Sequence, residues 1–401
     1  MLGYLAVNLK GQISPRKYHD KFCGELLPPE LTSENPRLVL ILNTHGAVRG
    51  RGFLARYEFI TDYNIPGKQI RDGMCSFLYD SKDTRKGSFN SPGHPGLYFI
   101  NLDCTYIFRG KPHEKIAISF EVFNLPNNDP HSCKATDYIE IYQQLEGPNN
   151  YSVIRRYCGK ANPGPILTER GVKILFHSDS DGIDMGFRAS YEFIKKEDIN
   201  KETDCSKTVL ANERWGGFIQ SPDYPLKYKP ITHCEWNIIA PSNSSRILLQ
   251  FTVLKLEGQG NSDQIENSCP RAVIRIYSNA DGIKPDKELC GVWKQGYSFV
   301  AKSHSVRVSF LSSSRSLGAK GFNLAWTELR GTGKCDGFKC AQSGYCIAPQ
   351  LKCNQLPNCG PQDESDESTE VAQCGIGPVI SEPMILGLSV LISVSVGLIL
   401  H

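Results

Sequence analysis

The chain has 401 residues, with 45 Lys and Arg against 42 Asp and Glu, and therefore a formal net charge of +3 at pH 7. This length predicts about two to four domains, and a charge so close to neutral, without a dense basic patch, gives no indication of a nucleic-acid partner. The 15 cysteines favour disulfide bonds formed outside the cytosol over zinc sites, because zinc would require closely spaced cysteine pairs.

The first 60 residues contain two segments that we expect to be strands, Tyr4–Val7 and Gly52–Ile60, and a Cys-Gly step at Cys23. Residues Met1–Lys10 lack the charged start, apolar run and cleavage site of a secretion signal. A disulfide-rich chain without such a signal is expected either to have lost its natural N-terminus or to leave the cell by an unconventional route.

These features return twice further along the chain, at an interval of roughly 134 residues. Each later copy has a strand-like segment, a Cys-Gly step and a Gly-Phe segment: Tyr138–Ile141, Cys158-Gly159 and 186–194, then Val273–Ile276, Cys290-Gly291 and 321–326. A repeat of this length is a whole domain rather than one turn of a solenoid.

Within the two complete copies, apolar residues alternate with polar ones over residues 116–122, 172–176, 247–251 and 306–310. This alternation predicts half-buried strands, and the clusters of Gly, Pro, Asn and Asp between them predict turns. No segment has the pattern of a capped helix longer than about ten residues. The sequence therefore predicts an all-β fold of tandem antiparallel β-sandwiches.

Two phrases in these copies resemble the opening of CUB domains. Residues 86–95 and 216–225 match that family's Gly-x-(apolar)-x-Ser-Pro-x-(Tyr)-Pro phrase, and Tyr106 and Trp236 follow the second cysteine of their copies by two residues. The resemblance implies CUB-like domains at residues 75–194 and 205–329 and the second half of a third at residues 1–60.

The CUB resemblance also implies the disulfide pairs Cys75–Cys104, Cys133–Cys158, Cys205–Cys234 and Cys269–Cys290. By the same analogy, the partner of Cys23 would lie 21–25 residues upstream, at or before Met1. Cys23 is therefore expected to be unpaired because the chain starts too late. A free thiol that forms an intermolecular bridge is the alternative.

Many CUB domains hold calcium at a loop end with one Glu and two Asp residues. In residues 75–194 the two Asp positions fall on Asp137 and Asp179, whereas the Glu position falls near Pro126, which cannot ligate through its side chain. Asp129 of the same loop is the candidate substitute for that Glu. Asp137 and Asp179 are expected either to bind calcium or to hydrogen-bond loop backbone. In residues 205–329, which we expect to be metal-free, the same three positions are held by Glu257, Ala272 and Ser313.

Residues 335–374 resemble an LDL-receptor class A module, because Phe338 precedes Cys340 by two residues and an Asp-x-Ser-Asp-Glu phrase spans 363–367. That family's disulfides would be Cys335–Cys346, Cys340–Cys359 and Cys353–Cys374. Such a small calcium-type module uses disulfides and a metal in place of a large core. The resemblance places the calcium ligands at the side chains of Asn354, Asn358, Asp366 and Glu367 and the carbonyls of Leu351 and Leu356. Because amides replace two of the four acids, we expect weaker calcium binding than is usual there, or only a solvated acidic loop.

Two sequons, at Asn150 and Asn243, are candidate glycosylation sites of an exported chain. Residues 384–400 form an uncharged apolar run close to the C-terminus. We expect this run to anchor the chain in a membrane, either as a GPI signal with Gly375 as the attachment site or as a single spanning helix.

The sequence contains no His-Glu-x-x-His, Gly-x-Ser-x-Gly or phosphate-binding glycine motif, so we expect no catalytic activity. The predicted protein is a binding protein anchored in the cell membrane, with its domains on the extracellular face. Its domain order resembles that of the Neto-like auxiliary proteins of neurotransmitter receptors, which implies that it binds or clusters cell-surface receptor or channel subunits. The alternatives are an endocytic or scavenging receptor of the cubilin kind, which binds soluble extracellular ligands, and the non-catalytic part of a tolloid-like protease.

Overall fold

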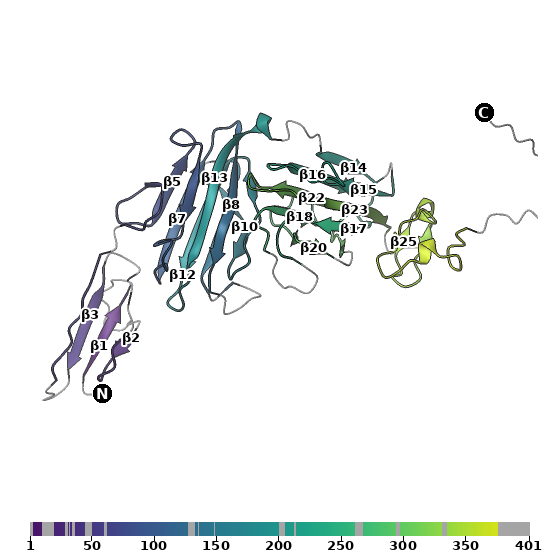
Figure 1. Cartoon of the computed structure of the whole chain (residues 1–401). Helices are drawn as coiled ribbons and strands as arrows, with labels where there is room; N and C mark the ends of the chain where they lie inside the picture. Colours follow the sequence, from purple (N-terminus) through teal and green to yellow (C-terminus); the bar gives the residue numbers. More distant parts are fainter. Residues whose placement is uncertain are drawn as a thin grey trace, which may run out of the picture.

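The computed structural model consists almost entirely of β-strands and their connections (Figure 1). The residues that it describes are 3–9, 20–28, 31, 33, 37–44, 50–59, 62–126, 133–134, 136–147, 149–199, 205–211, 214–260, 268–293, 297–330 and 335–375. The helices within these ranges are three short 3-10 turns, η1 (Lys196–Asp198), η2 (Pro349–Leu351) and η3 (Ser365–Glu367). The expected all-β fold class is confirmed.

The N-terminal sheet has three antiparallel strands in the order β2-β1-β3, formed by β1 (Gly3–Asn8), β2 (Asp20–Phe22) and β3 (Val39–Thr44). The strand expected at residues 52–60 is not formed, and residues 51–59 carry no ladder hydrogen bonds. The equivalent segment of the next copy is the strand β13 (Gly186–Lys195), which is held by pairing with two strands that precede it in the sequence. The described part of residues 1–60 contains no equivalent of those two strands.

The first sandwich, residues 62–199, contains two sheets with the strand orders β10-β9-β12-β7-β5-β4 and β11-β8-β13-β6. Two of the segments predicted from alternation lie inside β8 and β12. The remaining bounds are β4 (Lys68–Gln69), β5 (Ser76–Asp80), β6 (Lys86–Asn90), β7 (Leu102–Arg109), β8 (Glu114–Asn124), β9 (Tyr138–Gln144), β10 (Tyr151–Tyr157), β11 (Ile166–Thr168) and β12 (Gly171–Ser178).

The second sandwich, residues 205–330, repeats this architecture with the orders β14-β16-β22-β18-β19 and β15-β23-β17-β20, and β21 pairs with β17. The other two alternating segments lie inside β17 and β22. The bounds are β14 (Lys207–Leu210), β15 (Gly216–Gln220), β16 (His233–Ile239), β17 (Arg246–Lys255), β18 (Ala272–Tyr277), β19 (Lys287–Leu289), β20 (Val292–Trp293), β21 (Tyr297–Val300), β22 (Ser305–Ser312) and β23 (Gly321–Leu329).

Each sandwich contains one parallel strand pair that the sequence does not predict. β5 runs parallel to β7, and β14 runs parallel to β16. A disulfide joins the start of each pair, from Cys75 to Cys104 and from Cys205 to Cys234, with the same separation of 29 residues. The cross-link therefore accounts for the equal cysteine spacing in the two copies.

Aromatic side chains fill the space between the sheets of each sandwich. In the first sandwich Phe89 is fully buried and contacts Tyr106, Phe108 and Phe187, with ring centroids 4.9 to 5.8 Å apart. Full burial of one such side chain contributes about 1.5–3 kcal/mol. The corresponding rings of the second sandwich are Trp236, Phe251, Phe310 and Phe322.

The C-terminal cysteine unit, residues 335–375, contains β24 (Phe338–Lys339), β25 (Cys346–Ile347), η2 and η3. In Figure 1 the N-terminal sheet, the first sandwich, the second sandwich and this unit follow one another along the molecule. One small buried cluster joins Leu248 and Leu329 of the second sandwich to Ile347 and Leu351 of the unit. The C-terminal cysteine unit is thus docked on the second sandwich rather than only tethered to it.

Candidate functional site

A serine and a glycine hold the loops together at one end of each sandwich. In the first sandwich, the Ser91 hydroxyl oxygen accepts the N–H of Phe187 at 3.1 Å. The neighbouring Gly186 has a φ of +73°, and a Cβ at this position would overlap the Ser91 hydroxyl. The recurring Ser-Pro and Gly-Phe phrases therefore encode one contact between two loops. The second sandwich repeats it with Ser221, Phe322 and Gly321.

Asp137 is the buried centre of this loop end in the first sandwich, with an exposed fraction of 1%. Its Oδ2 accepts the Tyr98 hydroxyl at 2.5 Å, and its Oδ1 accepts the backbone N–H of Asp179 at 2.7 Å. Burial, together with the charge of Asp179, raises the pKa of Asp137 to about 6, although the two hydrogen bonds oppose this rise. The structure therefore brings the two predicted acids together.

The third ligand position of this loop end offers no side-chain oxygen. Pro126 occupies it, and its carbonyl oxygen accepts the Thr136 hydroxyl at 2.9 Å. Across the described residues, Asp137 and Asp179 do not join a third His, Cys, Asp or Glu in a group whose ligand atoms lie within 4.8 Å of one another. Among the described side chains, the donor set for calcium is thus incomplete, and Asp129, the candidate substitute for the third acid, lies outside the described residues.

Together with the half-buried Asp179, further acids surround the buried Asp137 and give the loop end a negative rim. Asp103 and Asp181 are exposed, and Asp184 is half-buried. His177 Nδ1 lies 2.7 Å from Asp103 Oδ1, and this hydrogen bond raises the pKa of His177. The same loops also carry three exposed apolar side chains, Leu97, Ile183 and Met185.

The equivalent loop end of the second sandwich is closed by Glu257. Its Oε1 accepts the N–H of Leu317 at 3.0 Å, and its Oε2 accepts the N–H of Gly318 at 3.1 Å. The Arg271 guanidinium lies 3.4 Å from Oε1. Burial alone would raise the pKa of Glu257, but these N–H groups and the Ser316 hydroxyl hold it below its usual value. Glu257 is therefore already satisfied by loop backbone and by a cation from the chain itself.

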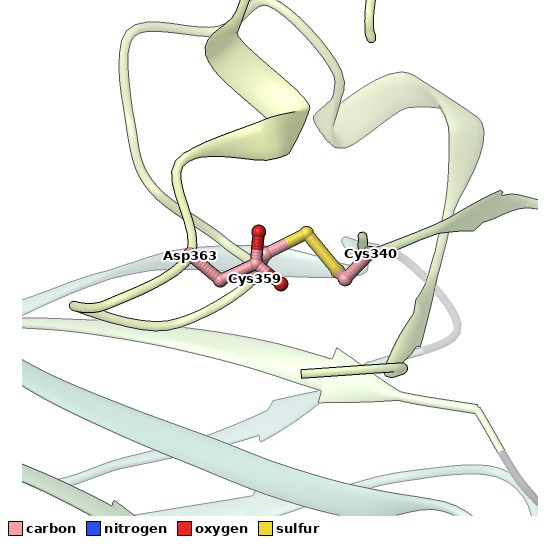
Figure 2. A group of neighbouring side chains, drawn as sticks. All are labelled: Cys340, Cys359 and Asp363. Carbon is pink, nitrogen blue, oxygen red and sulfur yellow. A yellow bond between two sulfur atoms is a disulfide. The ribbon is translucent and has the colours of Figure 1, made fainter. Parts of the chain in front are cut away.

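Within the described residues, one group of three potential ligand side chains lies within 4.8 Å, formed by Cys340, Cys359 and Asp363. Figure 2 shows that the two sulfur atoms are joined in a disulfide, so neither is a thiolate ligand. Asp363 instead accepts the N–H groups of Gln342 at 2.9 Å and Ser343 at 2.6 Å. Although burial opposes it, such hydrogen bonds lower the pKa of Asp363 to about 2. These three side chains stabilise the fold of the unit and do not form a metal centre.

The remaining predicted residues of the C-terminal cysteine unit also lie together. Asn354 and Asn358 are hydrogen-bonded to each other, Asp366 is fully buried, and the Glu367 carboxylate contacts the backbone of Asn354.

Seven disulfides connect cysteines that are 11 to 29 residues apart, in the same pairs that the two family resemblances imply. Cys23 is exposed and forms no disulfide within the described part of the chain. Seven disulfides are expected only in an oxidising compartment. The candidate glycosylation sites Asn150 and Asn243 are both exposed, as such modification requires.

The predicted membrane anchor, residues 384–400, lies outside the described residues, whereas its candidate attachment site Gly375 is described and exposed. No helix in the described part of the chain has the length and hydropathy of a membrane span.

The contact between the two sandwiches contains a buried charge cluster that the sequence analysis missed. Arg275 Nε lies 2.7 Å from Glu288 Oε1, and Arg275 Nη1 donates to the Pro165 carbonyl oxygen at 2.7 Å. The Tyr157 hydroxyl of the first sandwich donates to Glu288 at 3.1 Å. Arg275 interrupts an apolar run at residues 273–276, all of which are buried in β18. A charged residue inside such an apolar run is the sequence signal that could have revealed this cluster.

Comparisons with known proteins agree with this architecture. A model of the CUB domain matches residues 75–191 and 205–326. Rat (Rattus norvegicus) cubilin is 28% identical over 266 residues, which are 64% of this chain and 7% of cubilin. Human neuropilin-1 is 31% identical over 199 residues, 48% of this chain and 20% of neuropilin-1. Human tolloid-like protein 2 is 26% identical over 339 residues, 75% of this chain and 30% of that protein.

The chain thus spans less than a third of the length of each of these relatives. Among solved structures, the CUB1-EGF-CUB2 domain of human MASP-1/3 is 23% identical, with a TM-score of 0.26, and the match covers 61% of this chain and 100% of that one. The CUB repeats predicted within residues 75–194 and 205–329 are confirmed by the family match, whereas the partial copy predicted at residues 1–60 lies outside the matched ranges and stays a prediction. The matched ranges end before the C-terminal cysteine unit, so its resemblance to a class A module stays a prediction.

Proposed function

Because the chain belongs to the CUB domain family, we propose that it is a non-catalytic extracellular protein that binds a protein partner through the loop end of its first sandwich. The observation that carries this proposal is the negative rim around Asp137, formed by Asp103, Asp179, Asp181 and Asp184. Loops at the end of a rigid sandwich are the usual place for binding residues. The partner surface that fits this rim presents Lys or Arg side chains beside apolar ones.

The apolar residues of the rim support a protein partner rather than a small cation. Leu97, Ile183 and Met185 have exposed fractions of 55%, 44% and 46%. Apolar contact at the centre of an interface with charges around it is the usual composition of protein–protein contacts. A partner cation held between carboxylates would add charge-assisted hydrogen bonds at this place.

Calcium is not required by this proposal. Calcium takes six to eight oxygen ligands, and both carboxylate oxygens of Asp137 already accept hydrogen bonds. Pro126 removes the third acid. We therefore propose that the partner's basic side chains contact Asp179 and Asp181 directly, without a bridging metal.

The partner is proposed to be a cell-surface receptor or channel subunit, and the chain its membrane-anchored auxiliary or clustering subunit. This is supported by the order of two CUB-like sandwiches, a six-cysteine unit and the apolar run at 384–400. A second candidate function, capture of soluble ligands, is favoured by the similarity to cubilin.

The test is cross-linking of the full chain on living cells, followed by identification of the bound proteins with calcium present and with calcium chelated. The variant Asp179→Asn/Asp181→Asn is compared with Asp223→Asn/Asp281→Asn, which removes two exposed acids from the second sandwich. We expect the first variant to lower partner recovery about tenfold, which corresponds to roughly 1.4 kcal/mol, and the second to leave it unchanged. Recovery unaffected by Asp179→Asn/Asp181→Asn would overturn the proposed site. Soluble ligands lost on chelation would favour the scavenging function.

A further inference from the structure

One amide nitrogen stands at the centre of the oxygen cluster in the C-terminal cysteine unit. Asn358 Nδ2 shares its two hydrogens among three acceptors, the carbonyl oxygen of Leu351 at 3.1 Å, that of Leu356 at 2.8 Å and Oδ1 of Asn354 at 2.9 Å. The Asn358 side chain is 3% exposed. These three oxygens are the ones that the class A resemblance assigns to calcium. They converge on a hydrogen-bond donor.

The second sandwich fixes the orientation of this amide. The hydroxyl of Thr327, a fully buried residue of β23, donates to Oδ1 of Asn358 at 3.0 Å. An Asn side chain binds calcium only through its oxygen. To ligate a metal in the cluster, Asn358 would have to turn that oxygen inward. This removes the nitrogen from its three acceptors and places it opposite the Thr327 hydroxyl, whose proton loses its acceptor.

The two carboxylates of the same set are also engaged. Asp366 Oδ2 accepts the backbone N–H of Asn358 at 2.7 Å. The Glu367 oxygens accept the N–H groups of Asn354 at 2.8 Å and Gln355 at 2.9 Å. Hydrogen bonds from backbone N–H groups stabilise a carboxylate without a metal. The cluster therefore has its own donors for part of the charge that a cation would otherwise balance, while burial still raises the pKa of Asp366.

Docking on the second sandwich supplies the stabilisation that a metal gives to a small unit standing alone. Gln250 Nε2 donates to the carbonyl oxygen of Pro357 at 2.9 Å, next to the amide cluster. Leu248 and Leu329 extend the apolar core of the unit across the boundary. A unit of this size cannot bury enough surface by itself, so the shared core is a substantial addition to its three disulfides.

We propose that the Asn358 side-chain amide takes the place of a bound cation, so that residues 335–375 keep their fold without calcium while docked on the second sandwich. The residues present do not fit the calcium site that the resemblance implies. Calcium is replaced by an internal donor whose orientation depends on Thr327.

The test is hydrogen–deuterium exchange of the full chain, read by mass spectrometry on peptides from residues 335–375. Samples contain either EDTA or about 2 mM calcium, which exceeds the roughly 10⁻⁴–10⁻³ M dissociation constants of extracellular modules. We expect the exchange rates of these peptides to be the same in both samples. Slowing by about tenfold or more in calcium, the sign of a stabilising metal, would overturn the proposal.

Two sets of variants sharpen this test. Asn354→Asp/Asn358→Asp restores the acids and removes the donor, so its peptides should exchange about tenfold faster in EDTA and be slowed again by calcium. Asn279→Asp, the same chemical change at an exposed position, is the control. It should leave the exchange of these peptides unchanged, both in EDTA and in calcium. A folded double variant that ignores calcium would overturn the proposal. If the double variant does not fold, Thr327→Val provides the test. Faster exchange over residues 351–358 that calcium does not change supports the proposal. Unchanged exchange over these residues contradicts it.

Discussion

Arg275 and Glu288 of the second sandwich form an ion pair at 2.7 Å inside the contact with the first sandwich. Their side chains are 8% and 10% exposed. Arg275 also donates to the Pro165 carbonyl oxygen of the first sandwich, so the same guanidinium serves the ion pair and the junction. The orientation of the two sandwiches is therefore coupled to a buried charge.

Glu288→Ala should destabilise the second sandwich strongly, because it leaves Arg275 buried without a counter-charge. The expected loss is about 3–5 kcal/mol of unfolding free energy. All four tryptophans lie between residues 215 and 326, so urea unfolding followed by tryptophan fluorescence reports on this sandwich. Lys302→Ala, in the same sandwich, removes the ion pair of the exposed Lys302 with Asp286 and should cost about 0–1 kcal/mol. Equal losses in the two variants would contradict the buried role.

Gly186→Ala should destabilise the first sandwich by more than Gly73→Ala does. The two glycines have nearly the same φ, +73° and +74°, but a Cβ at Gly73 meets no atom within 4 Å. Both variants share a backbone penalty of roughly 1–2 kcal/mol, and Gly186→Ala adds about 1–3 kcal/mol for the overlap with Ser91. Calorimetric melting temperatures of the two variants measure the difference, and identical values would show that the Ser91 contact is dispensable.

The stability of the first sandwich should depend on the protonation of Asp137. Its pKa is about 6 in the folded chain against an ordinary value of 3.8, so the folded state binds the extra proton in this range. The cost of burying the carboxylate is therefore absent below about pH 4 and grows as the pH rises through about 6.

Asp137→Asn removes this titration. We expect the melting temperature of the natural chain, relative to that of Asp137→Asn, to be higher at about pH 4.5 than at about pH 7. Asp281→Asn serves as the control and should show no such trend. A difference between the natural chain and Asp137→Asn that stays constant with pH would rule out the raised pKa.

Glu257→Ala should loosen the loop at residues 316–318 of the second sandwich. It removes the acceptor of two backbone N–H groups and the partner of Arg271. A buried donor left unsatisfied costs about 1–3 kcal/mol. Hydrogen exchange of peptides covering this loop should accelerate, whereas Arg271→Ala, which leaves the backbone acceptor in place, should have a smaller effect. The reverse order would mean that the charge pair dominates.

Much of the fold could be predicted because the relevant signals are local. Alternation over residues 116–122 identifies β8, and the Ser-Pro and Gly-Phe phrases mark the contact between Ser91 and Phe187. The pairing of the predicted acids was also visible, since Asp137 and Asp179 do meet. Each of these features is determined by neighbouring residues or by a recurring phrase.

The features that could not be predicted depend on partners distant in sequence. The parallel pairing of β5 with β7 depends on the sheet order. The strand expected at residues 52–60 lacks neighbours among the described residues. The role of Asn358 depends on Thr327, 31 residues earlier and in another unit. The class A resemblance identifies Asn358 as a weak ligand, whereas the three-dimensional contact makes it a donor.

Each of the seven disulfides closes a loop within one sandwich or within the C-terminal cysteine unit. Across the described residues, no disulfide crosses from one of these bodies to the next. When the two ends of such a chain are pulled apart, the load passes across each boundary through a single backbone and through noncovalent contacts. The boundaries at Arg275 and at Thr327 would then separate before the cross-linked cores extend, so the molecule would lengthen in steps while the loops at the ends of the sandwiches stay intact.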